Sequence, residues 1–133
     1  KALIILPKAE MHRSLENPDY RYICRGVSPS GIRVNNLELS ASFILAPNQL
    51  LENWALRNMA ALDAEHWQPV IALKPGLFIL GTGETQVFPE PKHLAFFLQQ
   101  GIGFEVMNNA AAARTFNILA NEGRNVVAGF VLA

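Results

Sequence analysis

The first stretch whose residue types could bind a ligand is Gly81-Thr82-Gly83, which directly follows a run of apolar residues. Two glycines after a strand belong to the loop that binds the pyrophosphate of dinucleotides, but that loop needs a third glycine at a fixed offset and a helix that begins at once. Gln86 occupies the place of the third glycine, and the next helix signal comes several residues later. We therefore interpret the segment as a tight turn at the carboxyl end of a strand, the end of an open sheet where ligands tend to bind.

The second stretch is Glu122-Gly123-Arg124, at the predicted end of the last helix. A carboxylate in the last turn interacts unfavourably with the helix dipole, and a nearby cation would compensate for this. Arg124 or Arg114 could supply it. We favour a structural ion pair that fixes the helix end to the final strand, and the alternative is a charged pair that binds a substrate.

Two polar side chains, Thr115 and Asn117, flank the buried stripe of the same helix. Each either bonds neighbouring backbone or lines a cleft. We predict that the glycine turn, these side chains and the helix end border a single cleft at the edge of the central sheet, where a ligand or a partner binds. The residues of this predicted cleft are Gly81, Thr82, Gly83, Thr115, Asn117, Glu122 and Arg124.

Residues suited to metal binding and nucleophilic chemistry are scattered along the sequence. His12, His66 and His93 fall in three different segments without a metal-ligand spacing, so we expect surface histidines. Cys24 lies in an alternating strand pattern and is expected to be a buried, unreactive thiol. The sequence therefore predicts no catalytic residue, no metal site and no cofactor.

The order of elements in the second half must position the candidate cleft. Apolar runs predict strands over 77–80, 104–107 and 124–132, with an amphipathic helix in each gap. Parallel strands need a long connection that a helix can fill, so this order predicts parallel strands with crossover helices. Pro91 suits the first turn of the first helix. The buried face of that helix is predicted to contain Leu94, Phe97 and Leu98.

The first half of the chain predicts shorter strands. Alternation of Tyr20, Tyr22 and Cys24 indicates a half-buried strand, and the turn residues after it predict an antiparallel hairpin or meander over 20–39. The apolar run over 42–46 predicts a strand that is buried on both faces.

The remaining segments carry weaker signals. Residues 48–61 are interpreted as irregular chain or one or two helical turns. Asp63 is predicted to cap a helix that Pro69 kinks or restarts. Residues 1–18 are predicted to form an N-terminal arm that docks on the body, and residues 19–133 to form a single domain.

Composition limits the class of protein. Of the 133 residues, 50% are apolar and 17% are charged, which is typical of a globular chain with one core. Eleven basic and eleven acidic side chains balance, so no overall field gathers nucleic acid or an anionic membrane surface. The apolar run at residues 1–6 is too short to span a membrane, and a lone cysteine fits a reducing compartment. We expect a cytoplasmic protein.

These motifs together resemble those of the Mth938-like family, also called DUF498. The resemblance rests on Leu80-Gly81-Thr82-Gly83, on residues 101–107, and on residues 113–119 with Glu122-Gly123-Arg124. It implies an α/β (α+β mixed) fold of three layers, with a central mixed sheet, packed helices and an N-terminal antiparallel hairpin. It implies no established enzymatic activity. The family contains bacterial proteins and a mitochondrial assembly factor of respiratory complex I.

Two functions are compatible with these observations. The first is a non-enzymatic protein-interaction or assembly-type factor, which holds a partner around the glycine turn and the last helix, with Ile118 as an exposed apolar contact. The resemblance implies a protein partner of the respiratory chain, and a homodimer is also open. The alternative is a small-molecule binding protein or enzyme whose cleft beside Gly81–Gly83 takes an anionic ligand at Arg124.

Overall fold

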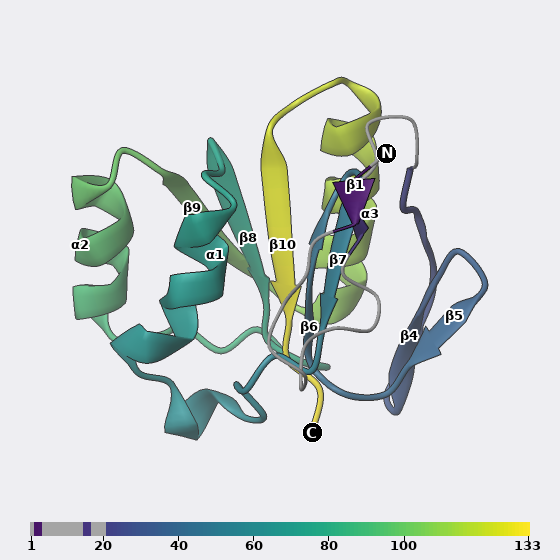
Figure 1. Ribbon diagram of the computed structural model, residues 1–133. Coiled ribbons are helices and arrows are strands. Elements are labelled where there is room, and N and C mark those ends of the chain that lie inside the picture. Colours follow the sequence, from purple (N-terminus) through teal and green to yellow (C-terminus); the bar gives the residue numbers. More distant parts are fainter. Residues whose placement is uncertain (1, 4–14, 17–20) are drawn as a thin grey trace.

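The computed structural model describes residues 2–3, 15–16 and 21–133. A five-stranded sheet forms the middle of the molecule (Figure 1). Its strands are β6 (Phe43–Ala46), β7 (Gln49–Glu52), β8 (Leu77–Gly81), β9 (Gly103–Met107) and β10 (Val126–Phe130). They stand in the order β7-β6-β10-β8-β9, in which β10, β8 and β9 are parallel and β6 is antiparallel to both of its neighbours. The predicted mixed central sheet is confirmed.

Both faces of this sheet are covered, which explains why its inner strands are apolar without alternation. Phe78 and Leu80 of β8 pack into one hydrophobic cluster, and Ile79 packs into the other. Each crossover helix covers a different face: α2 (Pro91–Gln99) joins β8 to β9, and α3 (Asn109–Asn121) joins β9 to β10. The predicted order of strands and crossover helices is confirmed.

The face that carries α3 also carries a small antiparallel sheet, seen beside α3 in Figure 1. Its strands are β3 (Cys24–Ser28), β4 (Gly31–Val34) and β5 (Leu37–Leu39), which confirms the predicted meander. The alternating Tyr22, Cys24, Ile32 and Val34 are buried and share one cluster with Phe116 of α3. This layer positions β3 against the outer side of α3.

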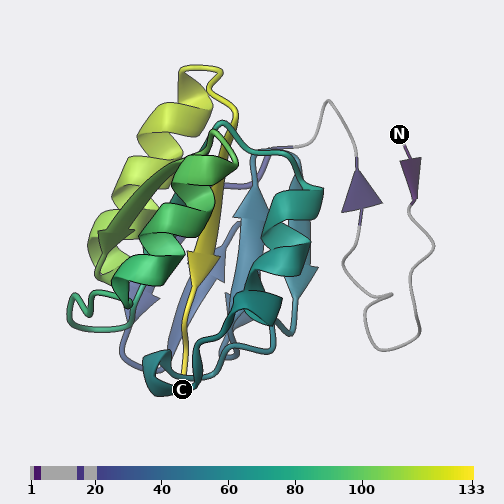
Figure 2. The ribbon, with the colours of Figure 1, turned by 90° about the vertical axis from the view of Figure 1, so that its left-hand side faces the viewer.

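The opposite face carries the short helices η2 (Met59–Ala61), η3 (Ala64–Trp67) and α1 (Gln68–Ala72) together with α2 (Figure 2). Trp67 is fully buried there, with ring centroids 5.7 Å from Phe78 and 5.0 Å from Phe97. Asp63 caps η3, and α1 begins at Gln68 with Pro69 in its first turn, so the predicted cap and restart are confirmed.

Three predictions about these elements are wrong. Residues 49–52, interpreted as irregular or helical, form β7, which pairs with β6 across a two-residue turn and buries Leu50. A four-residue strand is too short for its alternation to stand out from the sequence.

The predicted buried face of α2 is also wrong. Phe97 is buried as predicted, but Leu94 is exposed and Leu98 is 79% exposed. His93, expected at the surface, is buried instead, because the indole of Trp67 supplies its ring with a hydrogen-bond partner. Spacing alone could not choose between two overlapping apolar faces of so short a helix.

Of the predicted N-terminal arm, β1 (Ala2–Leu3) and β2 (Leu15–Glu16) are described, and they pair antiparallel. The rest of residues 1–18, and with it His12, lies outside the described residues, as does Tyr20. That part of the domain division stays a prediction.

Candidate functional site

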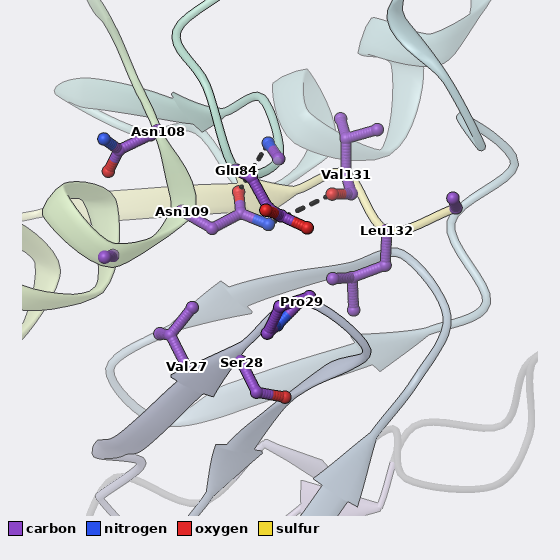
Figure 3. A pocket seen from close by; sticks show the side chains of 11 residues that line it. Val27, Ser28, Pro29, Glu84, Asn108, Asn109, Val131 and Leu132 are labelled. Carbon is purple, nitrogen blue, oxygen red and sulfur yellow. Dashed lines mark hydrogen bonds between the residues drawn. The ribbon is translucent and has the colours of Figure 1, made fainter.

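A cavity of about 370 Å³ lies at the carboxyl ends of the three parallel strands. Its walls come from the residues that directly follow β8, β9 and β10, and from the β3–β4 turn on the other side (Figure 3). This is the edge of an open sheet where ligands of α/β proteins bind. The lining residues are Val27, Ser28, Pro29, Gly83, Glu84, Asn108, Asn109, Ala110, Val131, Leu132 and Ala133.

Asn109 ties the ends of the three strands together. Its side chain is 4% exposed, and its Oδ1 accepts a hydrogen bond from Gly83 N at 3.1 Å. Its Nδ2 donates to Val131 O at 3.1 Å (Figure 3), and its backbone N donates to Gly83 O at 2.8 Å. The sequence analysis missed the role of Asn109; the adjacent Asn108 caps α3 by accepting a hydrogen bond from Ala111 N. Its polar groups hold the cavity floor and are not free to turn toward a ligand.

The glycine turn has the role predicted for it, that of backbone geometry. A Cβ on Gly81 would collide with Asn109 Oδ1 and crowd the ring of Phe130, and Gly83 has a left-handed φ of 102°. Thr82 is buried, and its Oγ1 donates to Thr85 O at 2.7 Å and accepts from Val87 N at 3.0 Å. The turn is therefore built from its own hydrogen bonds.

The other predicted cleft residues are not brought to this cavity. Thr115 Oγ1 lies 3.5 Å from Met107 Sδ, at the side of α3 that faces β9. Glu122 and Arg124 follow the C-terminus of α3. The nearby Val126 pairs with Leu77, the first residue of β8, whereas Gly83 comes after the last residue of β8, at the opposite end of the sheet. Gly83 alone of the seven predicted residues lines the cavity.

The ion pair predicted for Glu122 is not found among the described residues, with Arg124 or with Arg114. The helix end is closed by backbone instead: Gly123 N donates to Ala120 O at 3.0 Å and Arg124 N to Leu119 O at 3.0 Å. Gly123 has a φ of 79°, as its predicted role in ending the helix requires. Both charged side chains are exposed, and water solvates them.

The charge at the cavity argues against the anionic ligand of the alternative function. Among the described residues that line it, Glu84 is the one with a charged side chain (Figure 3). A carboxylate repels an anion. Arg124, the cation predicted to attract one, lies at the other end of the sheet.

A second hollow, of about 420 Å³, lies between the start of β3 and the outer side of α3. We call it the β3–α3 seam. Asn117 bridges it: Oδ1 accepts from Cys24 N and Nδ2 donates to Cys24 O, both at 2.9 Å. Ile118 is 59% exposed, as predicted. The seam is lined by Arg21, Tyr22, Ile23, Asn117, Ile118, Ala120 and Asn121.

Cys24 is buried beneath the seam, as predicted. Burial raises the pKa of its thiol to about 12, because the charged thiolate would lose its hydration. The thiol is therefore neutral and unreactive at physiological pH.

The fold and these sites define a small three-layer α/β domain in which the buried Asn109 and the half-buried Asn117 join the helix α3 to neighbouring strands and turns. Residues 24–131 match the family described as "Protein of unknown function (DUF498/DUF598)", and the chain belongs to that family.

Solved structures agree with this assignment. The NMR structure of a protein from Xanthomonas campestris is 44% identical, covers 92% of each chain and superposes with a TM-score of 0.79. A Bordetella pertussis protein described as a Mth938-like domain is 26% identical, with 83% of this chain and 85% of that chain covered and a TM-score of 0.72. The resemblance to Mth938-like proteins is confirmed.

A sequence relative carries a functional name. NADH dehydrogenase [ubiquinone] 1 alpha subcomplex assembly factor 3 of Xenopus tropicalis is 28% identical over 106 residues, which are 78% of this chain and 57% of that protein. The chain thus spans little more than half the length of this relative. Among the described residues, the longest helices are too short or too polar to cross a membrane.

Proposed function

We propose that this chain is a protein-interaction domain of the assembly-factor type, which holds a partner protein on the β3–α3 seam. The observation that carries the proposal is the pair of exposed aliphatic side chains, Ile23 and Ile118, that line one hollow from two different layers. Aliphatic side chains that gather at a hollow suit burial against a partner. The name of the Xenopus tropicalis relative supports an assembly role.

The charges along the seam favour an acidic partner surface. Arg21, Arg25 and Arg114 are exposed and make no ion pair with another described residue. Arg21 binds Ala120 O and Cys24 binds Asn117, so β3 and α3 run antiparallel along the seam. Arg114 lies one turn before Asn117 on the same side of the helix, and Arg25 adjoins Cys24. Carboxylates on a partner would meet Arg21 in the seam and Arg25 and Arg114 just beyond its end.

The seam is also preorganised. Asn117 holds the edge of β3 with two hydrogen bonds, so the two layers that contribute its apolar side chains do not separate when a partner docks. A rigid surface loses little conformational entropy on binding. A subunit of the respiratory chain is the candidate partner, in keeping with the name of the relative.

The proposal is tested by affinity purification with quantitative mass spectrometry, from cells with an intact respiratory chain. Ile118→Glu and the double variant Arg25→Glu/Arg114→Glu should lose the partner. Leu98→Glu, at an exposed position on α2, and Arg33→Glu, whose arginine pairs with Glu38 at 2.7 Å, serve as matched controls and should retain it.

Equal melting temperatures of the Ile118→Glu variant and the parent would show that the loss is not a folding defect. The proposal fails if all four variants recover the same proteins, or if the parent recovers nothing but itself. Recovery of the chain itself alone would point to the homodimer.

A further inference from the structure

A third hollow lies on the opposite side of the central sheet from the seam, between η2 and the loop that precedes α2. It is a groove of about 340 Å³ with mostly apolar walls. Phe88 forms one wall and is 71% exposed, although large aromatic side chains are usually buried. The lining residues are Met59, Ala60, Leu62, Val87, Phe88, Pro89, Glu90 and His93.

His93 is the polar side chain that is built into this groove. It is 3% exposed, and Trp67 Nε1 donates a hydrogen bond to its Nδ1 at 2.9 Å. An indole N–H can only donate, so His93 Nδ1 carries the lone pair and the ring proton of the neutral imidazole is on Nε2. Trp67 is itself fixed by the rings of Phe78 and Phe97, so the tautomer of His93 is set by the core.

The Nε2–H of His93 has no acceptor among the described residues. It is also not among the enclosed side-chain atoms without a partner in that part of the chain, so we infer that it is accessible from the groove that His93 lines. A donor on a buried side chain that meets no protein acceptor is satisfied by water or by a ligand. The groove therefore presents one oriented, neutral donor within apolar walls.

Electrostatics keep the ring neutral and select the ligand charge. Burial lowers the pKa of His93, and the ammonium of Lys92 lowers it further. The Glu90 carboxylate at the rim is paired with Lys92 Nζ at 3.5 Å, so the residues that line the groove offer no unpaired cation to an anionic ligand. A neutral hydrogen-bond acceptor can therefore bind the His93 N–H without bringing a charge into the apolar groove.

We propose that this groove binds a small neutral molecule whose amide or ketone oxygen is attached to an apolar group. The oxygen accepts from His93 Nε2–H, and the apolar group packs against Phe88, Val87 and Leu62. A groove of this volume and lining is within the range of small-molecule sites. This site is independent of the β3–α3 seam, so neither proposal depends on the other.

The first experiment is a direct observation of the ring. Long-range ¹H–¹⁵N spectra of the ¹⁵N-labelled protein should show His93 protonated at Nε2 and not at Nδ1. Titration with N-acetyl-leucine-N-methylamide should then shift the His93 Nε2–H resonance and the backbone amides of Phe88 and Leu62. A ring protonated at Nδ1, or a titration that leaves these resonances unchanged, overturns the proposal.

Matched probes separate the two halves of the recognition. N-acetyl-alanine-N-methylamide lacks most of the apolar group and should bind about fivefold more weakly or worse. N-acetyl-leucine, an anion at neutral pH, should lose at least as much, because its carboxylate would give up hydration to apolar walls that hold no unpaired cation. Equal binding of all three compounds would mean non-specific contact only and would overturn the proposal.

Matched variants test the wall without disturbing the fold. Phe88→Ala should weaken the leucine amide about fivefold, whereas Leu98→Ala, at a still more exposed position outside the groove, should leave its binding unchanged. Both variants should melt at the temperature of the parent, because both side chains are exposed. Equal effects of the two substitutions on binding would contradict the assigned site.

Discussion

Gly83 and Asn109 exchange two hydrogen bonds, since Gly83 N donates to Asn109 Oδ1 at 3.1 Å and Asn109 N donates to Gly83 O at 2.8 Å. The pair joins the turn after β8 to the start of α3. Through Nδ2, Asn109 also reaches Val131, which follows β10. The edge of the sheet where α/β proteins usually bind ligands is thus locked by a side chain whose polar groups are already in use.

Asn109→Ala should lower the free energy of unfolding by about 2–4 kcal/mol, because it leaves Gly83 N and Val131 O without partners in a largely buried place. Asn108→Ala removes only the cap of Ala111 N and should cost about 1 kcal/mol. Urea denaturation of the two variants and the parent measures both values. A loss at position 109 no larger than that at 108 would contradict the role given to Asn109.

Asn117→Ala should lower the free energy of unfolding by about 1–3 kcal/mol, because both backbone groups of Cys24 lose their partner along the edge of β3. Asn121→Ala, at an exposed position one turn later on α3, should change it by less than about 0.5 kcal/mol. Hydrogen exchange of the Cys24 amide gives a local readout. Unchanged protection of that amide in Asn117→Ala would disprove the bridge.

The Cys24 thiol should resist modification in the folded protein. With its pKa raised to about 12 by burial, the thiolate fraction at pH 8 is small, and reaction with a disulfide reagent should be about a thousandfold slower than in the unfolded chain. The chain contains a single cysteine, so the release of the coloured thiol reports on this residue alone. The measurement compares the rate in native buffer with the rate in about 6 M guanidinium chloride, where the chain is unfolded. Similar reaction rates in the two solvents would contradict the burial of the Cys24 thiol.

Acid should destabilise the protein through His93. Burial lowers its pKa in the folded state below the unfolded value of about 6.5, so the unfolded chain binds more protons between the two values. Stability from this group is complete above about pH 7, falls as the pH drops below 6.5, and levels off below the folded pKa. Protonation of Nδ1 would also break the bond from Trp67.

The control for this pH dependence is His93→Gln, which retains an acceptor for Trp67 and does not titrate; its stability profile between pH 5 and 7 should be flatter than that of the parent. His66→Gln should keep most of the slope, because glutamine suits the capping box with Asp63 and His66 is the smallest of the influences on the pKa of His93. Equal slopes of stability against pH in the parent and in His93→Gln would contradict the assignment of the acid sensitivity to His93. The charged or titrating groups around His93 are Lys92 and His66, which lower its pKa, and Glu90 and Asp63, which raise it.

Local signals in the sequence predicted the elements that carry them. Pro91 begins α2, Gly123 ends α3 and Asp63 caps η3, because each effect depends on the backbone conformation of one or two residues. The buried strands β6 and β8 were predicted from apolar runs, because the signal lies within the strand itself. In contrast, β7 and the inner face of α2 depend on partners that lie elsewhere in the sequence.

The predicted cleft shows where such reasoning ends. Gly83 follows β8 and Arg124 precedes β10. These two strands are parallel and Val126 is paired with Leu77, so the two residues lie at opposite ends of the sheet. The parallel arrangement that the order of elements predicts already implies this separation, and the prediction of a single cleft did not take it into account. Asn109 and Asn117 looked like helix polar residues, and their strand partners became visible only in three dimensions.

By itself, the sequence determined the class of fold, the order of strands and crossover helices, the burial of Cys24 and the exposure of Ile118, because apolar periodicity and turn residues act over short distances. The tertiary structure alone decided that His93 is buried against Trp67, that Asn109 locks the strand ends and that Asn117 joins α3 to β3. Each of these contacts satisfies a polar group whose partner lies some twenty or more residues away in the chain. Propensity and spacing carry no information over that distance, whereas packing and hydrogen-bond satisfaction do.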